Sequence, residues 1–290
     1  MPPSIFAPGL FAGRVVIVTG GATGIGLAIA EALVQLGAQV VIASRKGARL
    51  KTAALGLGAE YRAVVLPVEC NIRERAQVEA LFDRVLQRFG RVDCVVNNGG
   101  GQFLSPAAEI SPKGWQAVID TNLNGTWHVC QLAAQRWMLE HGGKIVNIVA
   151  DVWRGFPGMV HTGAARAGVI NMTKTLAVEW AAHGININCV APGVILTTGM
   201  HNYPPGVAEL AAREIPKKRL GSADEVASAV LYLLSPAADF VTGTTLRIDG
   251  GASLWGERWS IPDPEHSEPI TIPPWPEERW PEHAGDDEPE

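Results

Sequence analysis

A glycine-rich turn follows the first long apolar run of the chain. Residues 15–18 read Val-Val-Ile-Val, residues 19–26 read Thr-Gly-Gly-Ala-Thr-Gly-Ile-Gly, and a helical pattern continues from Leu27. A turn this tight needs residues without a Cβ, and free N–H groups at the start of a helix bind anions. A strand, a glycine turn and a helix in this order are typical of a dinucleotide-binding unit. The sequence therefore predicts a bound dinucleotide, contacted by Gly20, Thr23, Gly24, Ile25 and Gly26.

Apolar runs and helical patterns alternate over residues 10–255. We expect strands at residues 15–18, 39–43, 62–67, 93–96, 144–149, 186–190 and 245–248. We expect helices near 24–36, 46–56, 74–89, 112–140, 160–183 and 222–234. Short strands separated by helices favour a parallel sheet covered on both faces. We therefore predict an α/β fold of the Rossmann type, with a doubly wound, parallel, seven-stranded sheet in three layers, forming a single domain over residues 13–255 after a lead-in at 1–12.

Residues 256–290 differ from the rest in composition. They hold eight of the 20 prolines and eleven acidic residues, but only two basic ones. The prolines forbid a helix or a central strand, whereas large apolar side chains such as Trp275 and Trp280 oppose disorder. We expect an extended acidic arm lying on a surface, either over its own active site or on a neighbouring subunit. The remaining, mildly basic body suits a polyphosphate ligand but lacks the basic stripe of a nucleic-acid binder.

Cysteine usage and hydropathy exclude several classes of protein. The four cysteines, Cys70, Cys94, Cys130 and Cys189, form no Cys-x-x-Cys pair, and no metal site is expected. Their apolar neighbours favour buried free thiols in a reducing compartment. No stretch reaches the roughly 18 apolar residues of a membrane span, so no membrane partner is expected. The N-terminus lacks a basic region followed by an apolar segment, which favours a cytoplasmic location.

The end of the second expected strand bears on which dinucleotide binds. An NAD site usually has an acid there, which binds the ribose 2′-hydroxyl. This chain has Ser44, followed by Arg45 and Lys46. Together with the hydroxyl of Thr23, these groups match a 2′-phosphate, although a solvated charge pair opening the next helix is the alternative. We predict NADP(H) rather than NAD(H).

Two further segments are expected to border this cofactor. The residues after the third expected strand should flank the adenine, and the glycines after the fourth should let the backbone approach a ribose. These residues are Cys70, Asn71 and Ile72 in the first segment, and Asn98, Gly99 and Gly100 in the second.

Five motifs in order resemble those of the short-chain dehydrogenases/reductases. They are residues 19–26, 97–99, 121–125 with Asn122, Pro192-Gly193 and 249–251. Longer strings at 41–46, 70–73, 97–106 and 161–169 look most like the peroxisomal trans-2-enoyl-CoA reductases. The resemblance implies NADPH-dependent reduction of the C=C bond of a 2-enoyl-CoA thioester, with hydride added to the β-carbon. It also implies a homotetramer, and cofactor contacts from Asn122, Arg166, Pro192, Gly193, Ile195 and Thr197.

The C-terminus departs from those peroxisomal relatives. They end in a small-basic-leucine signal, whereas this sequence ends Glu288-Pro289-Glu290. A peroxisomal address is therefore not expected.

A second departure concerns the proton donor. Most of the family uses a Tyr-x-x-x-Lys pair, whose spacing puts both side chains on one helix face. None of the three tyrosines here has a lysine four residues later. Aligning on residues 167–169 places Thr162 and Arg166 at the two positions, and an alternative register places Ile170 and Lys174 there. An arginine can bind a ribose and hold positive charge, but it cannot relay a proton.

The missing tyrosine favours reduction of a double bond over reduction of a carbonyl. An alkoxide needs an acid of suitable pKa nearby, whereas an enoyl thioester collects negative charge on its oxygen, where hydrogen-bond donors suffice. We expect Asn122, Thr162 and Arg166 to be catalytic, with Tyr203 as a further candidate and Asp151 and His161 as weaker ones. Loop 194–220 should form an apolar lid over an acyl chain. Its cations, Arg213, Lys217, Lys218 and Arg219, could meet CoA phosphates or form ordinary surface ion pairs.

Two other functions stay open at this point. The first is a dehydrogenase or reductase of branched or terpenoid aldehydes, alcohols or their CoA esters, of the citronellal or citronellol kind. The second is an NADP(H)-binding sensor or scaffold that has lost catalysis.

Overall fold

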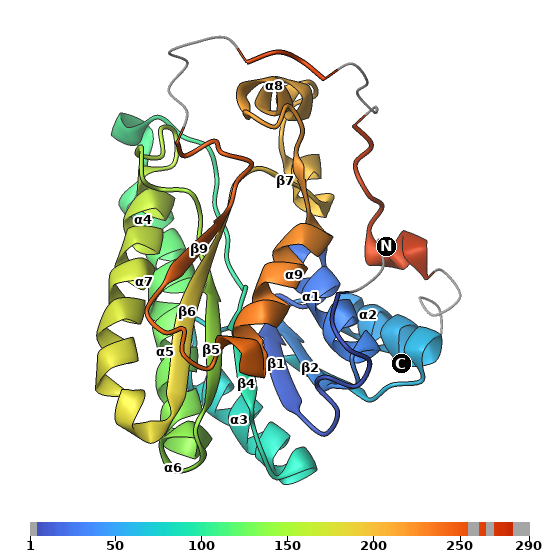
Figure 1. Cartoon of the computed structure of the whole chain (residues 1–290). Helices are drawn as coiled ribbons and strands as arrows, with labels where there is room; N and C mark the ends of the chain where they lie inside the picture. The colour runs from blue at the N-terminus through green and yellow to red at the C-terminus, as the bar shows by residue number, and fades with distance from the viewer. Residues whose placement is uncertain (1–4, 255–260, 265–269, 281–290) are drawn as a thin grey trace, which may run out of the picture.

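Seven parallel strands form one sheet through the centre of the molecule, in the order β3-β2-β1-β4-β5-β6-β9 (Figure 1). The structure is a computed structural model that describes residues 5–254, 261–264 and 270–280. The order reverses direction at β1, because the chain first builds outward to β3 and then crosses back to β4. The strands are β1 (Val15–Thr19), β2 (Gln39–Ser44), β3 (Val65–Glu69), β4 (Cys94–Asn97), β5 (Gly143–Ile148), β6 (Ile185–Pro192) and β9 (Thr245–Ile248).

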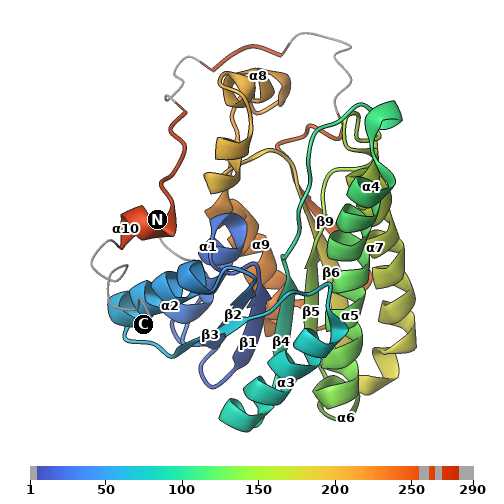
Figure 2. The same ribbon diagram turned by 180° about the vertical axis from the view of Figure 1, so that it is seen from behind.

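Helices cover both faces of this sheet (Figures 1 and 2). On one face lie α1 (Gly24–Gln35), α2 (Gly47–Tyr61) and α9 (Ala223–Leu234). On the other lie α3 (Arg75–Phe89), the long helix over residues 112–141 and α7 (Val160–Glu179). Successive side chains of β1 alternate between the two apolar cores, Val16 and Val18 in one and Val15 and Ile17 in the other. The predicted three-layer, doubly wound fold is confirmed.

The long helix contains two widened turns that the sequence pattern did not predict. It runs through α4 (Pro112–Ile119), the π-helical segment η2 (Asp120–Asn124), α5 (Gly125–Ala133), a second π segment η3 (Ala134–Met138) and α6 (Leu139–His141). Ser111 caps its start by accepting a hydrogen bond from the Gly114 N–H at 3.0 Å. Single π turns inside α-helices often occur at functional sites, and the first one here carries Asn122.

The segment expected as loop 194–220 has structure of its own. The short strand β7 (Ile195–Leu196) pairs with β8 (Gly221–Ser222), and between them lie the 3-10 helix η5 (Thr198–Asn202) and α8 (Val207–Glu214). A small apolar cluster holds this region together. It consists of Met200, Ala208, Ala212, Ile215 and Leu220, and we call it the lid cluster.

The third strand also lies later than expected. It was predicted at 62–67 and is found at Val65–Glu69, because α2 continues to Tyr61 and ends at Arg62 in a left-handed conformation (φ 49°).

The predicted arm is described only in part. Its residues 256–260, 265–269 and 281–290 lie outside the described residues, as does Trp255 just before it. The short helix α10 (Pro276–Arg279) lies beside α2 (Figure 2). The predicted boundaries at residues 12 and 255 remain a prediction.

The four cysteines are buried and unpaired, as expected. Burial raises the pKa of the Cys70 and Cys189 thiols to about 11, and that of Cys94 and Cys130 to about 12. These thiols therefore stay protonated at neutral pH and are poor nucleophiles. Among the described residues, no helix is long and apolar enough to cross a bilayer.

Candidate active site and cofactor site

The glycine turn after β1 leaves no room for side chains. Gly20 and Gly24 both have positive φ, of 66° and 54°, which glycine adopts without strain. A Cβ on Gly26 would overlap the carbonyl oxygen of Gly20 and the amide of Asn98. The turn is thus packed tightly from behind, and its helix, α1, starts at Gly24 with its N–H groups at the carboxyl end of the sheet.

Asn98 braces this turn from the neighbouring strand. Its Nδ2 donates to the carbonyl oxygens of Thr19 and Gly20, at 3.0 and 3.2 Å. In return, the Thr19 hydroxyl accepts hydrogen bonds from the backbone N–H groups of Asn98 and Gly99, at 3.0 and 2.8 Å. The Asn98 side chain, expected to border the cofactor, therefore also holds the turns after β1 and β4 in one arrangement.

Other predicted cofactor residues gather at the same edge of the sheet. A Cβ on Gly24 would lie 3.4 Å from the Thr197 side chain, so η5 begins over the glycine turn. Ile72 packs against Gly99, and the backbone of Cys70 donates to the Ser44 carbonyl at 2.9 Å. The remaining predicted cofactor residues follow β3 and β6.

The Asn71 side chain accepts a hydrogen bond from the Arg73 N–H. Pro192 ends β6, and Gly193 after it lies close to Asp249. Ile195 is buried and packs against Gly221.

An acidic residue lies beside the proposed 2′-phosphate position. Ser44 ends β2, and the exposed Arg45 and Lys46 lead into α2. Glu69 is the register partner of Ser44, and its Oε2 would lie 2.8 Å from a Cβ on Gly47. Glu69 has no recognisable signal in the sequence, because it lies 25 residues after Ser44 and only strand pairing brings the two together.

Arg166 and Asn122 meet around the backbone of Gly100 and Gly101. A Cβ on Gly100 would overlap Nη2 of Arg166 and lie 2.9 Å from Oδ1 of Asn122. Asn122 accepts from the Gly101 N–H at 3.0 Å and donates to the Gly101 carbonyl at 2.8 Å. Nη1 of Arg166 donates to the Ile148 carbonyl at 2.9 Å, at the carboxyl end of β5. Two predicted catalytic residues, from the π turn and from α7, thus share one site.

The guanidinium of Arg166 is a buried charge without an acidic partner among the described residues. Arg166 is 8% exposed, and burial lowers its pKa to about 10. This shift corresponds to a cost of about 3 kcal/mol to the folded state at neutral pH. The alternative register placed Lys174 in the lysine role, but Lys174 is exposed. The structure therefore favours the register that puts Thr162 and Arg166 on the family positions.

Thr162 and His161 are both fully buried at the start of α7. Nδ1 of His161 accepts from the Thr162 N–H at 2.8 Å, so the proton of the neutral ring is on Nε2. In the part of the chain that the structure describes, this Nε2 has no hydrogen-bond partner. The His161 ring stands edge-on to Phe103, with the ring centroids 4.5 Å apart. His161 is one of the weaker catalytic candidates from the sequence, and Phe103 is not among the predicted site residues.

The other candidate donors lie in different surroundings. The Tyr203 hydroxyl accepts from Gln102 at 3.0 Å, and its ring packs on the lid cluster. Burial raises the pKa of Asp151, and its Oδ1 has no partner among the described residues. Neither Tyr203 nor Asp151 forms a hydrogen bond with Asn122 or Arg166.

Two of the four lid cations have partners. Arg219 forms a two-pronged ion pair with Glu225, at 2.7 and 2.9 Å, which raises the pKa of Arg219. Lys218 donates to the Arg213 carbonyl at 2.8 Å and lies 3.9 Å from Asp263 of the arm. Arg219 therefore forms the surface ion pair that was the alternative to a CoA contact.

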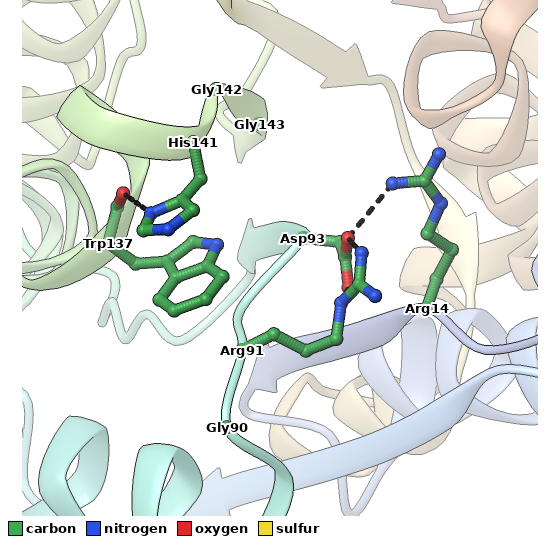
Figure 3. A pocket seen from close by; sticks show the side chains of 8 residues that line it. All are labelled: Arg14, Gly90, Arg91, Asp93, Trp137, His141, Gly142 and Gly143. Atoms are coloured by element: carbon green, nitrogen blue, oxygen red, sulfur yellow. Dashed lines mark hydrogen bonds and ion pairs between the residues drawn. The ribbon is translucent and has the colours of Figure 1, made fainter.

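A cavity of about 400 Å³ lies at the opposite edge of the sheet (Figure 3). It lies next to the starts of β1, β4 and β5, where Asp93 accepts hydrogen bonds from Arg14 and Arg91. Trp137 stacks on His141 in its wall, with the centroids 3.7 Å apart. Ligands of doubly wound sheets bind beyond the carboxyl ends of the strands, so this cavity is separate from the candidate site. The described residues hold no group of three or more side chains placed to bind a metal ion.

The chain is similar to known proteins over most of its length. A family profile described as "Enoyl-(Acyl carrier protein) reductase" matches residues 20–253. A peroxisomal 2,4-dienoyl-CoA reductase of Danio rerio, (3E)-enoyl-CoA-producing, is 40% identical over 254 residues, 86% of this chain and 85% of the relative. A probable 2,4-dienoyl-CoA reductase of Bacillus subtilis is 35% identical over 247 residues, 83% of this chain and 97% of the relative. A solved structure of a citronellol catabolism dehydrogenase from Pseudomonas aeruginosa PAO1 superposes with a TM-score of 0.78 at 45% identity, covering 86% of this chain and 99% of that one.

The chain belongs to the short-chain dehydrogenase/reductase family. It is therefore an oxidoreductase related to reductases of acyl-CoA thioesters. The predicted likeness to trans-2-enoyl-CoA reductases was wrong at the level of the subgroup, since these curated relatives are 2,4-dienoyl-CoA reductases. Short strings shared between neighbouring subgroups do not separate them, whereas alignment over the whole domain does.

Proposed function

We propose that this protein is an NADPH-dependent reductase of conjugated C=C bonds in acyl-CoA thioesters, with 2,4-dienoyl-CoA as the favoured class. The observation that carries the proposal is Arg166, a buried cation with no acidic partner among the described residues, next to Asn122. The names of the curated relatives support the dienoyl class.

The chemistry of a conjugated thioester fits such a site. Bound NADPH supplies a hydride. Whether a 2-enoyl thioester accepts it at the β-carbon or a 2,4-dienoyl thioester at the δ-carbon, the electron pair is delocalised onto the thioester oxygen. Addition of a proton at the α-carbon then completes the reaction, and a dienoyl substrate becomes a 3-enoyl product. Both substrates need a donor or cation near the thioester oxygen more than they need a strong acid.

The residues of this chain divide these tasks. Arg166 keeps positive charge in a buried site, and Asn122 fixes the backbone of Gly101 beside it. The Thr162 hydroxyl and the His161 Nε2–H are the buried donors one turn earlier on α7. Because neither a guanidinium nor a threonine is a useful acid at neutral pH, we propose that the α-carbon proton comes from water. We retain Tyr203 as a candidate donor on the lid.

The cofactor assignment to NADP(H) rests on the exposed Arg45 and Lys46 after Ser44. Glu69 pairs with Ser44 in register and lies near Gly47, so the assay below compares NADPH with NADH directly. The predicted cytoplasmic location and homotetramer remain predictions, and the word peroxisomal in the name of the Danio rerio relative describes that protein.

The test is an assay of wild-type protein with either NADPH or NADH, followed by cofactor absorbance. The substrates are a 2,4-dienoyl-CoA, a 2-enoyl-CoA and citronellal, with a control lacking substrate. We expect NADPH to be consumed with the thioesters at least roughly tenfold faster than with citronellal, a difference of about 1.4 kcal/mol in the barrier. Product analysis then distinguishes a 3-enoyl from a 2-enoyl thioester.

A second candidate function is oxidation of citronellol or a related terpenoid alcohol. The 45% identity to a citronellol catabolism dehydrogenase favours it. NADP⁺-dependent oxidation of citronellol that exceeds thioester reduction would replace the proposal by this candidate. Tight NADPH binding with no turnover of any of these compounds would point instead to a sensor or scaffold.

A further inference from the structure

The arm residues from Ile270 to Trp280 contact two parts of the molecule that flank the expected NADP(H) site. In Figures 1 and 2 this stretch descends from the level of α8 to α10, beside α2. The family profile ends at residue 253, so these contacts are additions to the shared domain.

One end of the stretch holds the lid. Ile270 and Ile272 pack against the lid cluster of Met200, Ala208, Ala212, Ile215 and Leu220. The carbonyl oxygen of Pro273 lies 3.2 Å from Nε2 of His201, which is on η5. The arm therefore contacts the lid through apolar packing and through one polar contact.

The other end is anchored on α1 and α2. Arg279 donates to both carboxylate oxygens of Glu31, at 2.7 and 3.0 Å, and the Glu31 side chain is only 4% exposed. The Trp280 ring lies against Gly56, where any Cβ would overlap it. A glycine at this position in α2 therefore leaves the space that the indole fills.

Trp275 joins these two ends. Its ring stacks on His201 with the centroids 5.3 Å apart, and the guanidinium of Arg49 lies 4.2 Å from the ring centroid. His201 is four residues after Thr197, which touches the glycine turn at Gly24. Arg49 lies in the first turn of α2, four residues after Arg45. One indole thus connects the segment over the glycine turn with the segment that follows the expected 2′-phosphate contacts.

We propose that Trp275 is a positioning residue for NADP(H), and that arm residues 270–280 form a strap that slows release of the cofactor. The strap holds η5 against the first turn of α2, so both must separate before the cofactor leaves. This inference rests on the proposed NADP(H) assignment.

The test uses the full chain with Trp275→Leu and Trp275→Phe. Both variants keep an apolar side chain, but only phenylalanine keeps a ring face for His201 and Arg49. NADPH release is followed by stopped flow and affinity by cofactor fluorescence, without substrate. We expect Trp275→Leu to release NADPH about fivefold faster and to raise its Kd for NADPH to a similar extent, because an exposed cation–π contact is lost. Trp275→Phe should stay within about twofold of wild type.

Phe89→Leu is the matched control, because it removes a ring that Arg88 contacts at 5.3 Å, at the far end of α3. Its release rate should equal that of the wild type. If Trp275→Leu released NADPH at the wild-type rate, as Trp275→Phe is expected to do, the strap would be overturned while NADP(H) binding stayed intact. Tighter binding by Trp275→Leu would show that the arm excludes the cofactor, which also overturns it. A wild type that does not bind NADPH would overturn the cofactor assignment and the strap together.

Discussion

At the scale of single residues, Arg166 is the most informative side chain. It is buried near Asn122 and has no ion pair with any described acid, so the fold carries a charge that stability alone does not favour. Groups of this kind cluster at functional sites. Replacing Arg166 should therefore lower activity without lowering the stability of the fold.

Arg166→Met should lower turnover by roughly 100-fold while leaving stability unchanged or higher. The methionine fills similar volume without a buried charge, whereas the developing negative charge of the reaction loses its cation. The measurements are NADPH consumption with a 2,4-dienoyl-CoA and the urea midpoint of unfolding. Arg166→Lys is the control, since it keeps the charge and should retain more activity. A methionine variant with wild-type turnover would remove Arg166 from the reaction.

Residue-level prediction depends on how much of the chemistry is local in sequence. The glycine turn, Asn122 and Arg166 could be proposed as site residues because each belongs to a motif of contiguous residues, and their roles remain predictions. Glu69 and Phe103 could not, because their importance depends on which residues the strands and loops bring beside them. The unpartnered Nε2 of His161 is likewise visible only once its surroundings are known.

At the scale of elements, α9 has the most completely capped start. The Ser222 hydroxyl accepts from the Glu225 N–H, and the Glu225 carboxylate accepts from the Ser222 N–H, forming a capping box. Arg219 completes it and helps to lower the pKa of Glu225 to about 2. This cap also fixes β8, and hence one end of the segment that carries η5 and α8.

Ser222→Ala should destabilise the protein by about 1 kcal/mol, because the Glu225 N–H loses the hydroxyl oxygen to which it donates. Urea unfolding at neutral pH measures the change. Ser228→Ala is the matched control: its hydroxyl only donates to the Asp224 carbonyl within the same helix, so its removal should change stability by less than about 0.5 kcal/mol. Equal losses in the two variants would show that the cap does not stabilise α9.

Element-level prediction succeeded for the regular alternation and failed where tertiary contacts decide. All seven strands of the central sheet were expected near their observed places, and the central ones, such as β1 and β4, are buried runs of mostly apolar residues. The helix α8 was missed, since it has eight residues and is held by the lid cluster rather than by a strong pattern of its own. The π turn at Asn122 was not predicted, because the apolar pattern continues through it as in an ordinary helix.

At the scale of the whole molecule, one ion pair ties the end of the described chain to its beginning. Arg279 and Glu31 are 248 residues apart in sequence, and Tyr61 also donates to Glu31 at 2.6 Å. The Arg279 guanidinium and this hydroxyl outweigh burial and lower the pKa of the Glu31 carboxyl. The pair therefore contributes stability above the usual carboxyl pKa range, and the contribution is lost as the pH falls through the lowered pKa.

Arg279→Met should destabilise the protein by about 3 kcal/mol near pH 7, because it leaves Glu31 buried without its cation. The difference from wild type should shrink in acid, as Glu31 becomes protonated in both proteins. Urea unfolding across this pH range measures it. Arg84→Met, an exposed arginine on α3, serves as the control and should have little effect at any pH. A pH-independent loss in Arg279→Met would mean that packing, rather than charge, is what the arginine provides.

The mutual hydrogen bonds of Thr19 and Asn98 have a consequence for how the enzyme cycles. They join the loops after β1 and β4, so the glycine turn that we propose to hold the cofactor phosphates is already shaped when folding ends. The entropy of that turn is lost once, during folding, and does not reduce the free energy of binding each time a coenzyme molecule binds. At the proposed NADP(H) site, each exchange of oxidised for reduced coenzyme would therefore take place on a turn that needs no reordering.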